Sequence, residues 1–319
     1  MPHRLSDQTL ARPTREGNNS LRKHTMSHHH LSDSEIDHYR REGYVVVEGV
    51  FSRDDLAAVD RTVRTLTDDA IAAGNHEQVM ELEPDPVDGK RVPRRLYNPF
   101  ELHETFRELA THPRILDRIE SLVGPDIGLQ HSKLNMKPAK VGSVVEWHQD
   151  LAYFPHTNDD LVTMLVYLDD ATEQNGCLQV LPRHHTHFFA HELPDGTFAG
   201  MITEPIGDGR FGRPVTLPAP AGSAIFMHPI TPHSSLPNTS DRPRRTLIFE
   251  YRAADAFPLH VGGYVGDLEK LTHHLRGREA RYARFGGPPP LMPVLPEKGT
   301  SLYQLQEKAK ETGDAKSSL

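Results

Sequence analysis

The stretch that decides how this sequence is interpreted is Trp147-His148-Gln149-Asp150-Leu151-Ala152-Tyr153-Phe154-Pro155. The chain has 21 histidines, but only His148 is followed two positions later by an acidic residue. Residues i and i+2 of a β-strand project to the same face, so one strand could present His148 and Asp150 to one metal ion. A second histidine on a neighbouring strand would complete a set of two histidines and one carboxylate. That set leaves coordination positions open and suits Fe(II) oxygenases.

Two histidines compete for the place of the third ligand. His228 and His233 both follow a predicted strand at 223–227. Arg244 lies 11 positions after His233 (244 − 233), whereas the same offset from His228 reaches Thr239. A guanidinium can hold a carboxylate through two parallel hydrogen bonds, as a dicarboxylic cosubstrate requires. We therefore prefer His233 and keep His228 as the alternative.

The sequence pattern changes near residue 124, from helical to strand-like. Helical spacing of apolar residues predicts helices at 33–42, 53–73 and 103–123, the first two preceded by the capping residues Ser32 and Ser52. Short apolar runs separated by turn residues predict strands after that point. Helices followed by many short strands predict a mainly β fold, a sandwich or barrel with the N-terminal helices flanking it. The predicted strands are 44–47, 127–136, 143–147, 161–168, 177–181, 214–217, 223–227 and 245–251, and a further helix is predicted at 272–284.

Composition excludes several functional classes. The formal net charge is −8 and basic residues form no long run with interleaved aromatics, so we expect no nucleic-acid partner. No apolar stretch is long enough to span a membrane. The single cysteine, Cys177, excludes an intramolecular disulfide and a cysteine-based zinc site, and it fits a reducing compartment. We expect a cytoplasmic protein whose partner is a small-molecule substrate.

The chain divides into three parts. We expect a flexible N-terminal extension at 1–31, one folded domain at 32–300, and a polar C-terminal tail at 301–319 that frays. Within the domain, residues 74–93 contain glycine, proline and many acids, which predicts an exposed loop.

From about Ser32 to Arg252 the chain resembles the phytanoyl-CoA dioxygenase family of Fe(II)- and 2-oxoglutarate-dependent enzymes. The resemblance implies a double-stranded β-helix (jelly roll) with iron between its two sheets. Three stretches carry it, namely His148 through Pro155, Asp169-Asp170-Ala171-Thr172 through Asn175-Gly176-Cys177-Leu178 to Leu181-Pro182, and His233-Ser234-Ser235 with Asn238 and Arg244.

The resemblance assigns roles to individual residues. It implies that His148, Asp150 and His233 bind Fe(II), and that Arg244 pairs with the C5 carboxylate of 2-oxoglutarate, with O2 as the second cosubstrate. Weaker correspondences concern further residues near the cosubstrate or the substrate. These are the hydroxyl of Ser235, Gln149, the cation Arg95, and Lys133 and Asn135, which lie two positions apart on one predicted strand and so share its face.

The resemblance implies hydroxylation of a small organic substrate of the acyl-CoA or secondary-metabolite type. Related halogenases have glycine or alanine where this chain has Asp150, so the carboxylate favours hydroxylation. The chain departs from the family at Pro182-Arg183-His184-His185, where Pro-Gly-Ser-His is common, and this leaves the substrate open. Two alternatives remain. One is desaturation, epimerisation or cyclisation by the same enzyme class, and the other is a non-catalytic, cupin-like metal-binding protein.

Overall fold

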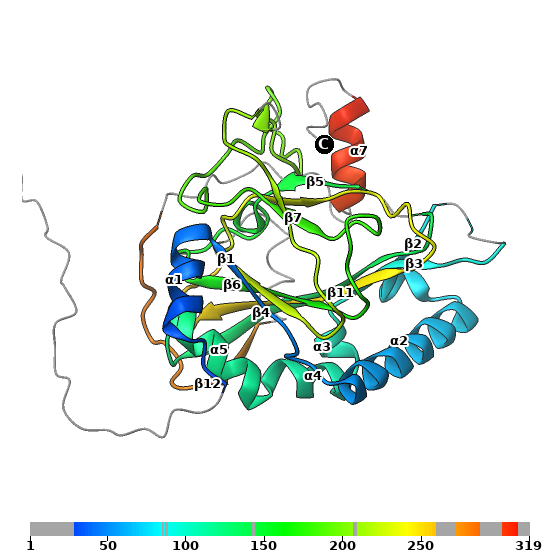
Figure 1. Cartoon of the computed structure of the whole chain (residues 1–319), viewed down its shortest axis with the longest axis horizontal. Helices are drawn as coiled ribbons and strands as arrows, with labels where there is room; N and C mark the ends of the chain where they lie inside the picture. The colour runs from blue at the N-terminus through cyan, green and yellow to red at the C-terminus, as the bar shows by residue number, and fades with distance from the viewer. Residues whose placement is uncertain are drawn as a thin grey trace, which may run out of the picture.

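Two antiparallel β-sheets with helices against the outer face of the larger one form the frame of the molecule (Figure 1). The computed structural model describes residues 29–84, 86, 89–141, 144–206, 209–259, 272–287 and 302–311. The predicted extension at 1–31 therefore lies almost wholly outside the described residues. The mainly β, jelly-roll prediction with flanking N-terminal helices is confirmed.

Within the described residues the larger sheet has the order β1-β9-β6-β11-β4-β3-β2, with β12 beside β4. The smaller sheet has the order β5-β10-β7-β8. The strands of the larger sheet are β1 (Tyr44–Val47), β9 (Ala224–Met227), β6 (Leu161–Tyr167), β11 (Arg244–Ala253), β4 (Ile127–Lys137), β3 (Pro93–Tyr97), β2 (Met80–Leu82) and β12 (His273–Arg276). Those of the smaller sheet are β5 (Val145–His148), β10 (His233–Ser235), β7 (Leu178–Val180) and β8 (Val215–Thr216).

The N-terminal helices begin where the capping signals predict. At α1 (Asp33–Glu42) the Ser32 side chain accepts from the backbone N–H of Glu35, whose carboxylate binds the Ser32 N–H in return. Ser52 and Asp55 repeat this exchange at α2 (Arg53–Ala73). Each reciprocal pair satisfies two backbone donors that a helix start leaves free.

The predicted helix at 103–123 is instead two helices, α4 (Glu104–Thr111) and α5 (Pro113–Val123), and the short helix α3 (Pro99–Leu102) precedes them. Pro113 has no N–H to donate and disfavours helical geometry at the residue before it. His112 accordingly has ψ of 135° and caps the next helix.

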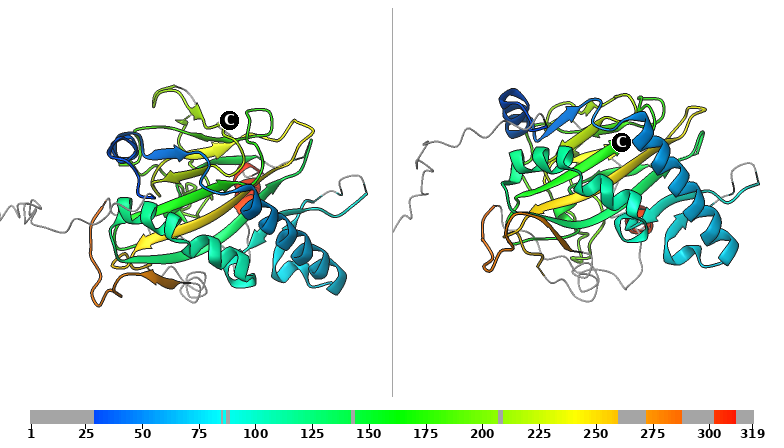
Figure 2. Two further views of the ribbon diagram at one scale, coloured as in Figure 1. Left: turned by 60° about the horizontal axis from the view of Figure 1, so that its bottom comes forward. Right: turned by 90° about the horizontal axis from the view of Figure 1, so that it is seen from below.

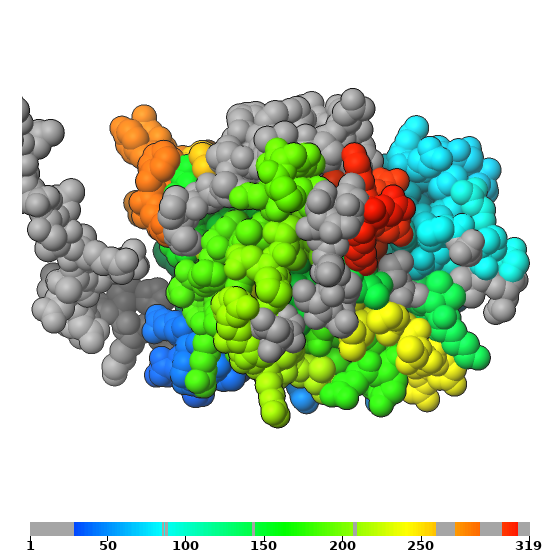
Figure 3. Space-filling view, turned by 90° about the horizontal axis from the view of Figure 1, so that it is seen from above, coloured from blue at the N-terminus to red at the C-terminus, as the bar shows by residue number. Residues whose placement is uncertain are grey.

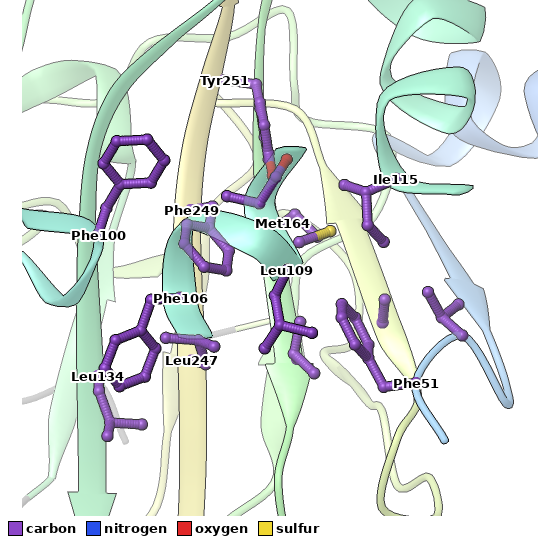
Figure 4. Close-up of a cluster of buried hydrophobic side chains, with 14 of the residues drawn as sticks. Phe51, Phe100, Phe106, Leu109, Ile115, Leu134, Met164, Leu247, Phe249 and Tyr251 are labelled. Atoms are coloured by element: carbon purple, nitrogen blue, oxygen red, sulfur yellow. The ribbon is translucent and has the colours of Figure 1, made fainter. Parts of the chain in front are cut away.

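Alternation along β11 divides its residues between two environments. Leu247, Phe249 and Tyr251 pack in the core beneath the helices, which cover this face of the sheet (Figures 2 and 4). Thr246 and Ile248 point to the other face and line a cavity. Because successive strand residues face opposite sides, one buried strand contributes both to the apolar core and to a polar interior.

Three further predictions of secondary structure are wrong. The segment predicted as a helix at 272–284 contains β12, which pairs with β4, so tertiary pairing overrides its local pattern. The predicted loop at 74–93 contains the 3-10 helix η1 (His76–Gln78) and the strand β2, whose Met80 is buried. In the tail expected to fray, Leu302–Glu311 forms the helix α7, which buries one face. No helix in the described part of the chain is long and apolar enough to cross a bilayer.

Candidate metal centre

The two sequence-predicted histidines face each other across neighbouring strands. In the antiparallel pair β5–β10, His233 is the register partner of His148. The strand β5 ends at His148, and Asp150 begins the 3-10 helix η2 (Asp150–Ala152). The expectation that one strand carries both His148 and Asp150 is therefore wrong. Gln149 is extended, and it carries the chain from the strand into the turn that directs Asp150 to the same site.

The three side chains form a compact cluster. The Nε2 atom of His148 lies 4.0 Å from Oδ1 of Asp150, and the Nε2 atom of His233 lies 3.8 Å from Oδ2. The two imidazole ring centres are 4.1 Å apart, and all three residues are buried. The prediction that His148, Asp150 and His233 come together is confirmed.

Hydrogen bonds to the backbone orient both imidazoles. Nδ1 of His148 donates to the carbonyl oxygen of Glu146 (2.8 Å), and Nδ1 of His233 donates to that of Thr231 (3.0 Å). A carbonyl only accepts, so both Nδ1 atoms carry the proton and both Nε2 atoms have a lone pair. Burial lowers the pKa of both imidazoles, which keeps them neutral. Neutral, oriented imidazoles are the form that binds a metal ion.

Asp150 is ionised in this environment. Burial alone would raise its pKa, but the Lys133 ammonium and the hydrogen bond from Thr163 act against that effect, and the pKa lies below its usual range. Nζ of Lys133 lies 3.6 Å from Oδ1 of Asp150 and 3.3 Å from Oε1 of Glu250, a buried acid on β11. Lys133 therefore supports a candidate ligand and is not free to face a substrate.

A hydroxyl links the two buried carboxylates. Oγ1 of Thr163 lies 2.8 Å from Oδ2 of Asp150 and 2.6 Å from Oε2 of Glu250. A hydroxyl has one hydrogen, so both short contacts are favourable when one carboxyl is protonated. Burial, aided by the charge on Asp150, raises the pKa of Glu250 to about 7. Protonated Glu250 can thus donate to Thr163, which donates to Asp150.

A cavity of about 50 Å³ opens beside the triad, between the two sheets. Val145, Leu165, Leu178 and Ile248 form its apolar walls. Its polar lining combines four basic side chains with hydroxyl and amide groups. Those residues are Arg95, Lys133, Asn135, Lys137, Thr163, Ser234, Ser235, Arg244, Thr246 and Tyr303.

Arg244 presents a buried positive charge to this cavity. It is 5% exposed, and it donates to Thr246 Oγ1 and to the carbonyl oxygen of Gly176, each at 2.7 Å. Its Nε atom has no hydrogen-bond partner, and no carboxylate among the described residues lies within ion-pair distance. A buried charge left without a counter-ion is costly, so the site favours an anionic ligand.

His228 and Arg245, the alternatives to His233 and Arg244, do not line the cavity. Nε2 of His228 lies 3.9 Å from Asp159 and its ring packs near that of His185, so it belongs to a different cluster. Arg245, the residue after Arg244, points out of the cavity and pairs with Asp60 and Asp169.

The weaker sequence predictions have mixed outcomes. Arg95, Lys133, Asn135 and Ser235 line the cavity. Gln149 does not, because its amide donates to the backbone carbonyls of His187 and Ile230 and accepts from the N–H of Phe189. These bonds use the whole side chain to fix the turn before Asp150, so we no longer expect it to contact the cosubstrate.

Sequence reasoning missed several residues of the site, among them Lys137, Thr163, Thr246, Glu250 and Tyr303. Glu250 had a usable signal, since it is a lone acid in the apolar strand Leu247-Ile248-Phe249-Glu250-Tyr251. Lys137 is 2% exposed and donates to the carbonyls of Ser235 and Leu236. Tyr303 carries no such local signal, because it comes from a segment that the sequence presents as a polar tail.

The residues present fit an Fe(II) ion and a dicarboxylate. Two neutral imidazoles and one carboxylate, with no cysteine, are a ligand set suited to Fe(II). The unpaired guanidinium of Arg244, within the same cavity, is suited to a carboxylate. Hydroxyls of Ser235 and Thr246 lie in that cavity as further donors.

Comparison with known proteins agrees with this chemistry. The family model described as phytanoyl-CoA dioxygenase (PhyH) matches residues 39–246. A probable alpha-ketoglutarate-dependent hypophosphite dioxygenase of Stutzerimonas stutzeri is 32% identical, over 77% of this chain and 87% of that protein. The L-proline trans-4-hydroxylase of Streptomyces griseoviridis is 27% identical, over 72% of this chain and 89% of its own length.

A solved structure supports the same assignment. The epimerase SnoN, in complex with Fe³⁺, alpha ketoglutarate and nogalamycin RO, superposes with a TM-score of 0.59 at 28% identity. The alignment covers 80% of this chain and 94% of that one. The chain is therefore an enzyme that depends on Fe(II) and 2-oxoglutarate, and it belongs to the phytanoyl-CoA dioxygenase family.

Proposed function

We propose that this dioxygenase hydroxylates a small substrate that carries an oxyanion, with His148, Asp150 and His233 as the iron ligands and Arg244 as the partner of 2-oxoglutarate. The observation that carries the proposal is the buried, unpaired guanidinium of Arg244 in the same cavity as the triad. A protein that only bound a metal would gain nothing from this uncompensated charge. Fe(II) and 2-oxoglutarate, when bound, supply dioxygen activation coupled to the conversion of 2-oxoglutarate into succinate and CO2.

The chain's own residues orient the reactants and exclude water. The carbonyls of Glu146 and Thr231 hold the imidazoles, and Lys133 and Thr163 hold Asp150. The apolar walls of the cavity strengthen the electrostatic attraction between Arg244 and a bound carboxylate, because they keep the local dielectric constant low. Ser235 and Thr246 add hydroxyl groups at that end of the cavity.

Two observations favour a small anion over an acyl-CoA. The first concerns the cationic lining of the cavity beside the triad. Arg95 lines it, and its Nε atom has no hydrogen-bond partner, which suits a second anionic group. Of the cations that a CoA phosphate would need, Arg183 is paired with Glu42 and Arg94 with Glu81. The named substrates of the two relatives above, hypophosphite and L-proline, are both small and carry an oxyanion.

The first test is an anaerobic titration of the purified protein with Fe(II) and then 2-oxoglutarate, followed by visible absorption. We expect the weak charge-transfer band of an Fe(II)–2-oxoglutarate chelate in the wild type and its loss in His233→Ala. His228→Asn is the matched control, since it changes a partly buried histidine outside the triad, and it should retain the band. A folded, iron-loaded wild type without a band would contradict the proposal.

The substrate class is tested separately by a screen for succinate release in air. Small carboxylates, phosphonates and hypophosphite form one arm, and acyl-CoA thioesters form the other. We expect stimulation by the small oxyanions. Stimulation only by acyl-CoA would leave the iron and 2-oxoglutarate roles intact and overturn the substrate class. We also expect a cytoplasmic location, since the single cysteine suits a reducing compartment, and cell fractionation would test it.

A further inference from the structure

The helix α7 supplies one wall of the cavity, although it lies far along the chain from every other lining residue. Leu302 and Tyr303, in its first turn, are both lining residues. Tyr303 is 5% exposed, and the guanidinium carbon of Arg94 lies 4.2 Å from its ring centre. Burial raises the pKa of the phenol, so the ring is neutral, and Arg95 and Arg244 oppose that rise by a smaller amount. Tyr303 lines the same cavity as Arg95 and Arg244.

Polar contacts attach α7 to the strand that carries a candidate iron ligand. β5 is at the edge of the smaller sheet in the described residues, and such edges leave backbone groups free. Oε1 of Gln306 accepts from the N–H of Glu146 (3.3 Å), and Nε2 of Gln306 donates to the carbonyl of Gly200 (2.8 Å). Nζ of Lys310 lies 2.5 Å from the Glu146 carboxylate. Gln306 and Glu146 are 2% and 1% exposed, so the Gln306 hydrogen bonds are shielded from water, whereas the Lys310 side chain is 36% exposed.

Glu146 connects the helix to the metal centre. Its N–H and its carboxylate bind α7, and its carbonyl oxygen accepts from Nδ1 of His148. A displacement of α7 would therefore disturb the residue that orients this imidazole. Groups that orient a ligating histidine affect metal affinity as well as geometry.

Apolar contacts fix the other side of α7. Leu305 packs with Ala152 and Phe198, and Ala309 packs with Leu193, Ala199 and Met201. The exposed residues of the helix, among them Glu307 and Lys308, form its outer face, and Figure 3 shows α7 in red at the surface of the molecule. The helix is thus an amphipathic element held against the active-site half of the fold, on the opposite side from α2–α5 (Figure 1).

We infer that Tyr303 is a positioning residue for 2-oxoglutarate, and that α7 closes the Arg244 end of the cavity against water. The inference rests on the proposed role of Arg244. With the ring in place, the attraction between the guanidinium and a carboxylate acts in a dry environment, where it is strong. Without the ring, water reaches the cations and screens that attraction. Stacking of Tyr303 on Arg94 adds a cation–π contact that fixes the ring.

The test compares three full-length variants in anaerobic titrations of the Fe(II) protein with 2-oxoglutarate. Tyr303→Leu keeps an apolar side chain but removes the aromatic plane, and Gln306→Leu removes both hydrogen bonds of the docked helix. We expect each to raise the Kd for 2-oxoglutarate about tenfold, the effect of losing roughly 1.4 kcal/mol of binding free energy. Glu307→Gln, on the exposed face, should match the wild type.

A second readout separates a positioning role from a merely structural one. In air, Tyr303→Leu should release more succinate per hydroxylated product than the wild type, because a wetter cavity favours uncoupled turnover. Binding of 2-oxoglutarate within twofold of the wild type in both folded variants would overturn the inference. Absence of the charge-transfer band in the wild type would instead overturn the proposed function, so the two failures are distinguishable.

Discussion

Arg244 and Arg245 are neighbours in the chain, yet they have opposite surroundings. Alternation along β11 turns Arg244 into the cavity, where it has no counter-ion among the described residues, and turns Arg245 outward to Asp60 and Asp169. The pKa of Arg244 is lowered by burial, and that of Arg245 is raised mainly by its hydrogen bonds to Asp169. The same side chain is therefore a binding group at one position and a structural ion pair at the next.

This contrast gives a matched pair of variants. Arg244→Met keeps a long side chain but loses the charge, and we expect the Kd for 2-oxoglutarate to rise about 100-fold, since a charge-assisted bidentate pair contributes roughly 2–3 kcal/mol. Arg245→Met should leave that Kd unchanged and lower the free energy of unfolding by about 1 kcal/mol. Anaerobic titration and urea unfolding would measure the two quantities. An equal effect of both variants on binding would contradict the assignment of Arg244.

Glu250 gives a pH-dependent prediction in metal-free protein. Its folded pKa of about 7 is above the ordinary value of 4.5, so between these pH values the folded state retains a proton that the unfolded state has lost. The folded state binds more protons there, and stability falls as pH rises. Glu250→Gln removes this titration, while its amide can donate to Thr163 and accept from Lys133.

We therefore expect Glu250→Gln to gain stability relative to the wild type as pH rises from about 5 to 8, by an amount on the order of 1–3 kcal/mol. Urea unfolding at both pH values in the presence of a chelator would measure the difference. The other titratable groups are the same in both proteins, so the quantity to compare is how the difference in the free energy of unfolding between the two proteins changes with pH. A difference that stays constant with pH would show that Glu250 is ionised throughout.

At the scale of elements, the turn before β7 positions Arg244 from a distance. Gly176 has φ of +74°, and its carbonyl accepts from the Arg244 guanidinium. A Cβ at this position would collide with the backbone carbonyl oxygen of Leu236, which follows β10. Asn175 fixes the same turn by donating to the carbonyl of Asp170 and accepting from the N–H of Thr172. The turn thus holds two strands of the smaller sheet together and presents an acceptor to the site.

Gly176→Ala should therefore destabilise the fold and weaken cosubstrate binding together. A positive φ costs alanine about 1 kcal/mol, and displacement of the turn from Leu236 adds roughly 1–3 kcal/mol. Gly196→Ala is the control, since Gly196 has φ of +83° but open space around its Cβ. Thermal unfolding and 2-oxoglutarate titration would compare the variants. Equal losses of stability in the two variants would mean that the clash with Leu236 is relieved without cost.

At the scale of the whole molecule, the site joins the two sheets. His148 and His233 lie on strands β5 and β10 of the smaller sheet, whereas Lys133, Thr163 and Arg244 come from strands of the larger sheet. A bound metal and a bound dicarboxylate would therefore connect both sheets. Ligands that bind only the folded state stabilise it by mass action.

We expect Fe(II) with 2-oxoglutarate to raise the melting temperature under anaerobic conditions. At ligand concentrations about 100 times the Kd, the stabilisation is about 2.7 kcal/mol, which corresponds to a shift of several degrees for a chain of this size. Succinate, with the same far carboxylate but no keto group, should give a smaller shift. Asp150→Ala, which removes one ligand, should show little shift with Fe(II). A full shift in that variant would place the metal elsewhere.

The helix starts and the chemistry of the metal site could be predicted from local sequence alone. The capping residues Ser32 and Ser52 act through hydrogen bonds within three positions along the chain, so their effect is local. The spacing of His148 and Asp150, and the offset between His233 and Arg244, is likewise visible in one dimension. The strand β6 could be predicted because apolar residues line both of its faces, and β4 and β11 because apolar residues recur at alternate positions along much of their length.

Which residues meet across the two sheets depends on how distant parts of the chain pack together. β12 forms as a strand because β4 offers it an edge, against its local pattern. Glu250 becomes a protonation site because folding places it beside Lys133 and Thr163. Tyr303 lies at the cavity because Gln306, in the same helix, forms buried hydrogen bonds with Glu146 and Gly200, which are more than a hundred residues earlier in the chain. Contacts between distant segments depend on how the whole chain packs, and no local pattern in the sequence records them.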